Sequence, residues 1–289
     1  MEDFIIEPFL HPDHSNQFIN TKEISDLLLM RPDQLFLPHR IQFNSIHLFY
    51  EEGGTFTVDF KVINIKKRYI LFVSPNQISQ FHHPVTSKGR VMIFTEDFLC
   101  KGSIQSQFYG HAHLFNDPLT LPYFDLGDRF EEVSSLFDYI EKELARPYNE
   151  MQTMLLNNYL FNILLIAERV PVNTENKLDI CGNKILVSKF KSLVNKNLHQ
   201  QYGLNYYSEE LNIGLRTLQN AFLKVENQTP KQWLINRMVL EIKRNLMYNG
   251  ISISEIAYKL GFNEVTNFTK FFKSKTGVTP TQFRKSFQE

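Results

Sequence analysis

The sequence lacks the features of a membrane-spanning or secreted protein. It contains no run of 18 apolar residues, so no transmembrane helix is expected. The opening stretch, Met1 to Ile6, carries no basic side chain ahead of its short apolar patch, which argues against a secretory signal. The two cysteines, Cys100 and Cys181, are too few for a disulfide framework. We therefore expect a cytoplasmic protein with no membrane partner.

Motifs of common enzyme classes are also missing. The chain has no Walker loop, no Gly-x-Ser-x-Gly turn and no Cys-x-x-Cys pair. We therefore assign no catalytic residue and no cofactor, and we do not expect an enzyme. His111 and His113, followed by Asp117, have the spacing of a cupin metal motif, but Asp stands where Glu is usual and no further ligand can be placed. Histidines with ordinary protein neighbours are the better interpretation, so no metal site is predicted.

The 289 residues do contain ample apolar material and an uneven charge. Hydrophobic residues make up 43% of the chain and include 26 phenylalanines, which argues against wholesale disorder and can fill more than one core. Residues 1–181 hold 15 basic and 24 acidic side chains, a formal charge of −9, whereas residues 182–289 hold 16 and seven, a charge of +9. A basic half beside an acidic half indicates nucleic acid as the partner of the basic half. The polar segment 171–176 lacks periodicity and predicts a linker.

The basic half contains a repeat. The run Thr-Pro-Lys-Gln-Trp at 229–233 returns fifty residues later as Thr-Pro-Thr-Gln-Phe at 279–283, and Leu218 and Phe222 return as Phe268 and Phe272. Two copies are too few for a solenoid, so we expect a duplicated helical module.

The second copy has the more regular pattern. Ser252 and Glu255 fit a capping box at a helix start, and an apolar face at helical spacing follows. Gly261 is suited to end that helix, and Asn263 is placed to cap the next one. Helix, glycine turn and helix together predict a helix-turn-helix module.

The first copy follows the same plan less regularly. Residues 207–211 predict its first helix, residues 212–214 its turn, and the apolar face of Leu215, Leu218 and Phe222 its second helix. One long helix from Trp233 to Met247 is expected between the copies. Each polar outer face is by itself typical of a solvated helix, but two such modules in a domain of charge +9 favour DNA binding.

Residues 251–280 resemble the signature of AraC/XylS-type transcription regulators. Three elements occur in order: Ile-Ala-x-x-x-Gly-Phe at 256–262, Phe-x-x-x-Phe-Lys at 268–273 and Gly-x-x-Pro at 277–280. The resemblance covers roughly residues 187–287. It implies seven helices, with two helix-turn-helix modules joined by a long helix and both recognition helices in successive major-groove segments. Ser208, Gly214 and Ile242 depart from the residues usual in the family.

The resemblance also implies particular DNA contacts. The base-contacting positions of the family fall on Arg216, Gln219 and Asn220 in the first recognition helix, and on Thr266, Asn267 and Lys270 in the second. We assign phosphate contacts, which position a helix without reading sequence, to Thr217, Lys224, Thr269 and Lys273.

The acidic half predicts short strands and turns followed by two helices. Strands are expected at 46–50, 55–60, 68–73 and 91–94, with turns at 51–54 and 74–76, which suggests a small β-barrel or jelly roll. Pro38-His39-Arg40 and the two turns resemble the cupin-like domain of the same family. That resemblance implies effector binding inside the barrel, dimerisation, or both.

Two helices are expected after the barrel. The first has Phe130, Val133, Phe137, Ile140 and Leu144 at helical spacing, and the second has Met151, Met154, Leu155, Tyr159 and Ile163. Two alternatives are open: one of these helices forms a homodimer interface, or both pack on the barrel. We favour a homodimer because two helices are more apolar cover than one small barrel needs.

The expected fold class is α+β with two domains. Residues 1–170 form a cupin-like effector-binding or dimerisation domain, residues 171–183 a linker, and residues 184–289 an all-α AraC-type DNA-binding domain. The leading interpretation is a sequence-specific transcription regulator of double-stranded DNA modulated by a small molecule. Activation would also require contact with RNA polymerase. A regulator controlled by a protein partner or by abundance is the alternative, and a metal-dependent cupin enzyme fused to a DNA-binding domain is a third.

Overall fold

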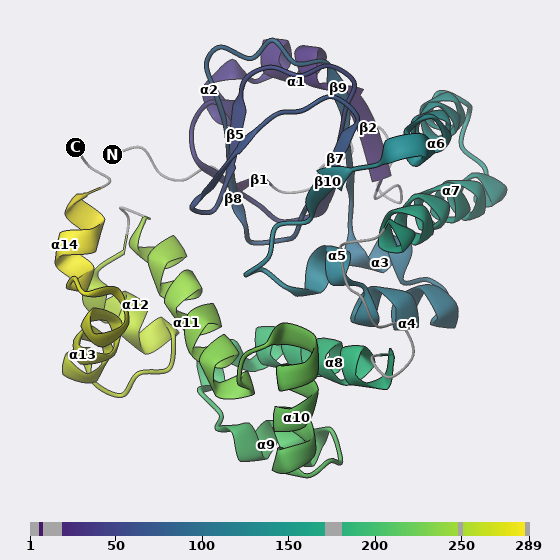
Figure 1. Ribbon diagram of the computed structural model, residues 1–289. Helices are drawn as coiled ribbons and strands as arrows, with labels where there is room; N and C mark the ends of the chain where they lie inside the picture. Colours follow the sequence, from purple (N-terminus) through teal and green to yellow (C-terminus); the bar gives the residue numbers. More distant parts are fainter. Residues whose placement is uncertain (1–5, 8–18, 171–180, 248–250, 287–289) are drawn as a thin grey trace. The chain divides into compact units, whose positions relative to one another are not determined.

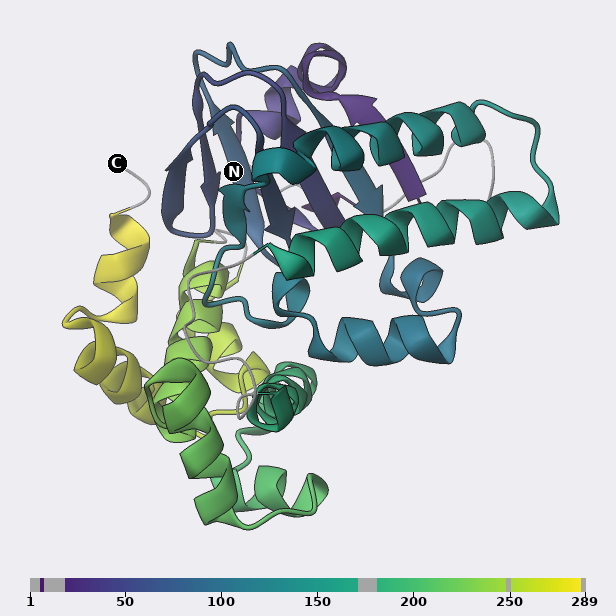
Figure 2. The ribbon, with the colours of Figure 1, turned by 45° about the vertical axis from the view of Figure 1, so that its right-hand side comes forward.

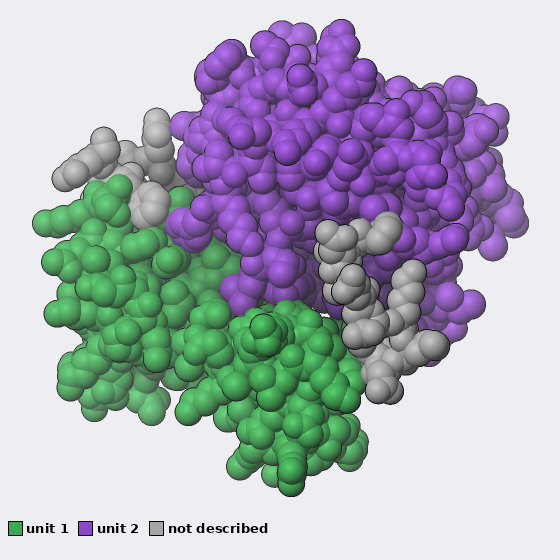
Figure 3. All heavy atoms as spheres, viewed as in Figure 1, with its two compact units in different colours: residues 1–4, 175–289 green, residues 5–174 purple. Residues whose placement is uncertain are grey.

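The computed structural model describes residues 6–7, 19–170, 181–247 and 251–286. The chain divides into two compact units, one within residues 5–174 and one within residues 175–289 (Figure 3). Most of the predicted linker, residues 171–180, lies outside the described residues, and helix α8 begins at Cys181. Among the helices described, none combines the length and the apolar character needed to cross a bilayer.

The N-terminal unit is built on two five-stranded sheets. One has the order β1-β3-β8-β5-β6 and the other the order β10-β7-β4-β9-β2. The short β1 pairs in parallel with β3, whereas the other pairs are antiparallel. The strands are β1 (Ile6–Glu7), β2 (Ile19–Glu23), β3 (His39–Ile41), β4 (Asn44–Phe49), β5 (Thr55–Val58), β6 (Lys61–Asn64), β7 (Tyr69–Val73), β8 (Ile78–His82), β9 (Gly89–Phe94) and β10 (Tyr123–Asp125). The predicted barrel is not closed within the described residues, because no ladder joins one sheet to the other.

Every residue of the central strand β4 is buried, because each face of its sheet covers a core. Phe49 points into the core between the two sheets, together with Phe56 and Phe81 from the opposite sheet. Ile46 and Leu48 point to the other face. Burial among aromatic rings lowers the pKa of His47 on this strand to about 3, and the nearby His39 adds to the effect.

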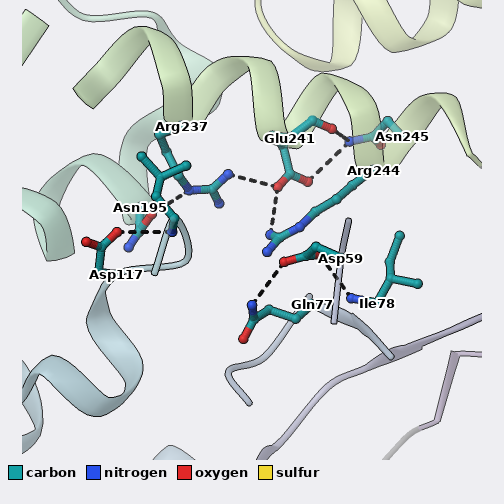
Figure 4. A network of polar contacts seen from close by, with 10 residues as sticks. Asp59, Gln77, Ile78, Asp117, Asn195, Arg237, Glu241, Arg244 and Asn245 are labelled. Carbon is teal, nitrogen blue, oxygen red and sulfur yellow. Dashed lines mark hydrogen bonds and ion pairs between the residues drawn. The ribbon is translucent and has the colours of Figure 1, made fainter. Parts of the chain in front are cut away.

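One predicted strand is shorter than expected. Residues 55–60 were expected to form one strand, but β5 ends at Val58 and pairs directly with Lys61 of β6. Asp59 takes a positive φ of 54° in the turn between them, a conformation that Asp tolerates better than most residues. Its carboxylate accepts hydrogen bonds from Gln77 Nε2 and from the backbone N–H of Ile78 (Figure 4), so the side chain of Asp59 ties the turn to the start of β8.

Two long helices cover the outer face of the second sheet. α6 (Phe130–Leu144) and α7 (Glu150–Arg169) lie side by side (Figure 2), and their apolar faces meet Ile46, Leu48 and Met92 in one core. The shorter helices of this unit are α1 (Ile24–Met30), α2 (Pro32–Leu35), α3 (Glu96–Leu99), α4 (Ser103–His111), α5 (His113–Asn116) and a 3₁₀ turn at Gly127–Arg129.

The apolar residues expected at helical spacing on α7 do not all face the core. Met151 and Met154 are 62% and 60% exposed, and Leu155 is also exposed. The buried face instead includes Gln152 and Asn157, whose amide groups donate to the backbone carbonyls of Glu143 and Phe98. These bonds to distant segments let two polar residues face inward, so the apolar spacing near the helix start does not mark the core.

The C-terminal unit consists of helices. They are α8 (Cys181–Asn197), α9 (Leu204–Glu210), α10 (Leu215–Glu226), α11 (Pro230–Leu246), α12 (Ile253–Lys259), α13 (Val265–Thr276) and α14 (Pro280–Lys285), with a 3₁₀ turn at Leu198–Gln200. Figure 1 shows α11 running from the group of α8, α9 and α10 to the group of α12, α13 and α14. The seven described helices are the number that the family resemblance implied.

Candidate nucleic-acid interface

The two predicted helix-turn-helix modules are present as α9–α10 and α12–α13. Their first helices begin 49 residues apart and their second helices 50 residues apart. The turn of the first module, residues 211–214, is therefore one residue shorter than the turn of the second, residues 260–264. The left-handed position in these turns is held by Asn212 with a φ of 53° in the first module and by Gly261 with a φ of 80° in the second.

An aromatic cluster holds the first module together. The ring of Phe190, from α8, lies 5.3 Å from Tyr207 of α9, 5.0 Å from Phe222 of α10 and 6.0 Å from Trp233 of α11, centroid to centroid. All four side chains are fully buried. The nearly perpendicular Phe190–Phe222 pair is a favoured aromatic geometry. Helix α8 thus provides the centre of a core whose other members come from the module itself and from α11.

An ion pair also fixes the end of the first recognition helix. Lys191 Nζ of α8 donates to Glu226 Oε1 at the last turn of α10, at 2.5 Å, and the two side chains are only 3% and 16% exposed. The Lys191 ammonium also lies 5.6 Å from the centroid of the Trp233 ring. Nothing in the local spacing indicated this pair, because its members are 35 residues apart.

The second module depends on caps and a glycine. The predicted capping box is confirmed: Ser252 Oγ accepts from the backbone N–H of Glu255, whose carboxylate accepts from the N–H of Ser252. These bonds lower the pKa of Glu255. The prediction that Asn263 caps α13 is wrong, because the helix begins one residue later, with Glu264 at the cap position and no side-chain hydrogen bond there.

Gly261 allows a close approach in the second module. A Cβ at this position would lie 2.1 Å from the backbone oxygen of His199, which belongs to the 3₁₀ turn after α8. Next to it, Gln201 Nε2 donates to the carbonyl of Leu260 at 2.8 Å. The turn of the second module therefore packs on the segment that leads into the first.

The ten residues predicted to contact DNA lie on the outward faces of α10 and α13. Nine of them are exposed and Thr269 is half-buried, whereas Leu218, Phe222, Phe268 and Phe272 on the opposite faces are fully buried. None of the four basic side chains in this set makes an ion pair with another described residue. The exposed set is Arg216, Thr217, Gln219, Asn220 and Lys224 on α10, and Thr266, Asn267, Lys270 and Lys273 on α13.

The helix between the modules carries a polar network that the sequence did not indicate. Glu241 Oε2 accepts from Arg237 at 3.1 Å and from Arg244 at 3.2 Å, and Arg237 Nε also donates to Asn195 Oδ1 of α8 (Figure 4). On its apolar side α11 buries Trp233, Ile242 and Leu246 completely. Helix α11 therefore contacts other parts of the unit on both faces, through the Arg237–Asn195 hydrogen bond on its polar side and through buried apolar side chains on the other.

The possible metal motif of the N-terminal unit does not form a site among the described residues. His111 ends α4 and His113 begins α5, while the carboxylate of Asp117 accepts from the backbone N–H of Leu119 in the following turn. Within the described ranges, no three His, Cys, Asp or Glu side chains are arranged to hold a metal ion. A cleft of about 330 Å³ lies where the 3₁₀ turn at 127–129 meets the end of α7, and Arg129 and Arg169 are among its lining residues.

Comparisons with known proteins agree with the geometry of the C-terminal unit. Residues 207–286 match the family model described as a helix-turn-helix domain. The transcriptional regulator YdiP of Escherichia coli is 20% identical over 86% of this chain and 82% of its own length. The Msm operon regulatory protein of Streptococcus mutans is 23% identical over 84% of both chains, and the transcriptional activator RhaR of Escherichia coli is 25% identical over 88% of both.

Solved structures were also found to be similar. ToxT from Vibrio cholerae is 13% identical, covers 93% of this chain and 98% of its own, and has a TM-score of 0.42. The DNA-binding domain of AdpA, solved in complex with a target DNA, is 24% identical over 35% of this chain and 92% of its own, with a TM-score of 0.33. The paired modules and the matched domain show that this chain carries a DNA-binding helix-turn-helix domain of the AraC type, and the chain is similar to transcription regulators over most of its length.

Proposed function

We propose that the protein reads two successive major-groove segments of double-stranded DNA with α10 and α13. The observation that carries this proposal is the division of both helices into a buried apolar face and an exposed polar face at matching repeat positions. Arginine, glutamine and asparagine offer paired donors and acceptors for guanine and adenine edges, and lysine neutralises phosphate.

Selection from a randomised DNA library with the full-length protein tests this function. We expect a site of two short motifs about one helical turn apart. Replacing Arg216 or Lys270 by Ala should weaken binding to that site by about 5- to 150-fold. Lys142→Ala, an exposed basic residue of α6, serves as the control and should bind like the wild type. Wild-type affinity for both recognition-helix variants in gel-shift titrations would reject the proposal.

The salt dependence of binding gives an independent check. Each phosphate neutralised by a lysine or arginine releases counterions, so affinity should fall steeply with salt concentration. Lys224→Ala and Lys273→Ala, at the positions assigned to phosphate, should each reduce the salt slope by about one without changing the selected sequence. A changed sequence preference would instead place these lysines at base edges.

We propose further that a small molecule acting on the N-terminal unit modulates DNA binding. The cleft lined by Arg129 and Arg169 supports this, because Val170, which also lines it, immediately precedes the predicted linker. A ligand bound to the native state raises its stability, and a modulator must also change the affinity for DNA. A panel of metabolites tests both expectations, with thermal unfolding to measure stability and DNA titration to measure affinity. A panel without effect would favour control by a protein partner or by abundance.

The homodimer is supported by the outward residues of α7. Met151, Met154 and Leu155 are exposed although they are apolar, and clustered exposed apolar residues often mark interfaces. We expect a dimeric mass by light scattering at micromolar concentration and a monomeric mass for the double variant Met151→Glu, Met154→Glu. A monomeric wild type would reject the dimer. Activation would add RNA polymerase as a partner.

A further inference from the structure

The outward face of the first recognition helix is not entirely polar. Arg216, Asn220 and Leu223 follow one another at spacings of four and three residues, which places them along one face of α10. Leu223 is 52% exposed, whereas Leu218 and Phe222 of the same helix are fully buried. Leu223 therefore contributes little to the core and presents an apolar side chain on the face predicted to meet DNA.

The second module has a different residue at the same place. An offset of fifty puts Lys273 of α13 at the position of Leu223, and Lys273 is exposed and positively charged. A lysine there can neutralise a phosphate, which a leucine cannot. The repeat thus presents two chemically distinct groups at one geometric position, so the first module must use this position differently.

The length of the face matches a short run of base pairs. With a rise of 1.5 Å per residue, Leu223 lies about 10 Å along the axis from Arg216. Base pairs are spaced by about 3.4 Å, so the face spans roughly three of them. In the major groove the donors and acceptors of the bases are polar, and the apolar group presented there is the C5-methyl of thymine.

We propose that Leu223 is a specificity-determining residue that recognises thymine through its C5-methyl group in the half-site bound by the first module. This inference rests on the proposed function, since α10 must enter the major groove for the contact to form. It assigns to Leu223 a preference for one base pair and assigns no such preference to Lys273.

Replacing thymine by deoxyuridine tests the contact, because the substitution removes the methyl group and leaves the polar edge of the base unchanged. The probe is the DNA site selected by the wild-type full-length protein, with each thymine of the first half-site replaced in turn. We expect one replacement to weaken wild-type binding by about fourfold, the effect of one buried methyl group. Leu223→Ala should bind the thymine site about three- to tenfold more weakly and should not respond to the same replacement.

Two further variants separate this contact from a general apolar effect. Ile185→Ala removes another exposed apolar side chain, on α8 outside both modules, and should keep the wild-type response to deoxyuridine. Leu223→Lys introduces the residue of the second module. It should increase the salt slope by about one and abolish the thymine preference. Circular dichroism serves to check that each variant is folded.

The outcomes distinguish this inference from the function on which it rests. An equal response of wild type and Leu223→Ala to every deoxyuridine, or a selected half-site without thymine, overturns the role of Leu223. If Arg216→Ala still loses binding in that case, the proposed function stands. If the wild-type protein selects no site at all, both are overturned.

Discussion

The two helix-turn-helix modules reach the same arrangement by different physical means. The first is centred on Phe190, which comes from outside the module, and its recognition helix is anchored to α8 by the Lys191–Glu226 ion pair. The second has stronger signals within its own sequence, above all the capping box of Ser252 and the left-handed turn at Gly261, although that turn also packs against His199. A repeated fold can thus keep its shape while long-range contacts in one copy replace local ones in the other.

The largest loss of stability is expected for a variant that disrupts the core of the first module alone. Phe190→Ala removes the ring that contacts Tyr207, Phe222 and Trp233, and should lower the free energy of unfolding by about 3–5 kcal/mol. The single tryptophan of the chain, Trp233, lies in this cluster, so its fluorescence reports on unfolding of this part of the protein. A loss below about 1 kcal/mol in a urea titration would show that the cluster does not hold the module.

The corresponding test of the second module is its glycine turn. Gly261→Ala places a methyl group against the backbone oxygen of His199 at a φ of 80°, and should cost about 2–3 kcal/mol. Gly277→Ala is the matched control, because its φ is 83° and a Cβ there meets nothing within 4 Å. It should cost about 1 kcal/mol. Equal losses in thermal unfolding would mean that the contact with His199 is unimportant.

Breaking the buried ion pair should have an intermediate effect. Glu226→Gln removes the carboxylate that the ammonium of Lys191 contacts at 2.5 Å in a nearly dry site and should cost about 2 kcal/mol. The exposed pair Lys88–Glu51 in the N-terminal unit provides the control, and Glu51→Gln should change stability by less than about 0.5 kcal/mol. Similar small losses for both variants in chemical denaturation would contradict an anchoring role for Glu226.

A smaller effect is expected at the helix cap of the second module. Ser252→Ala removes the hydroxyl that accepts from the N–H of Glu255 and should cost about 1 kcal/mol. Because the folded-state pKa of Glu255 is lowered, its contribution is present above the ordinary value of 4.5 and is lost as the pH falls through the folded-state value. The stability difference between wild type and variant should therefore shrink in acid. A stability difference that does not change with pH would show that the Ser252 hydroxyl stabilises the helix independently of the Glu255 carboxylate.

The smallest effect is expected for a variant that introduces the same helix cap into the first module. Gly203 precedes α9 at the position of Ser252, has extended backbone angles, and a Cβ there meets nothing within 4 Å. Gly203→Ser should stabilise the protein by about 0.3 kcal/mol. Differential scanning calorimetry measures the change, and a loss of stability would show that the entry to α9 cannot accept a capping side chain.

The same contrast explains which parts of the structure could be predicted. Ser252 and Glu255 act within a few residues of their own positions, and Gly261 ends the helix that they begin, so these roles could be predicted from spacing. The close approach of Gly261 to His199 could not be predicted in this way. Phe190 lies 32 residues before Phe222, and no periodic pattern links them. Nor could spacing show that Gln152 and Asn157 lie on the buried face of α7, where they donate to backbone carbonyls of other segments. The ten DNA-contacting residues remain predictions, although nine of them lie exposed on the expected faces.

If both modules enter the major groove as proposed, helix α11 has a consequence for the DNA site itself. The modules follow one another in the same sense along the chain, and their recognition helices carry different residues, so no two-fold axis relates them. Palindromic sites reflect two-fold protein symmetry, which this domain does not have. The DNA bound by one such domain must therefore have a direction, with distinct left and right halves. The half-sites must also keep a set separation, since α11 is packed on both faces and one added base pair rotates one half by about 34°.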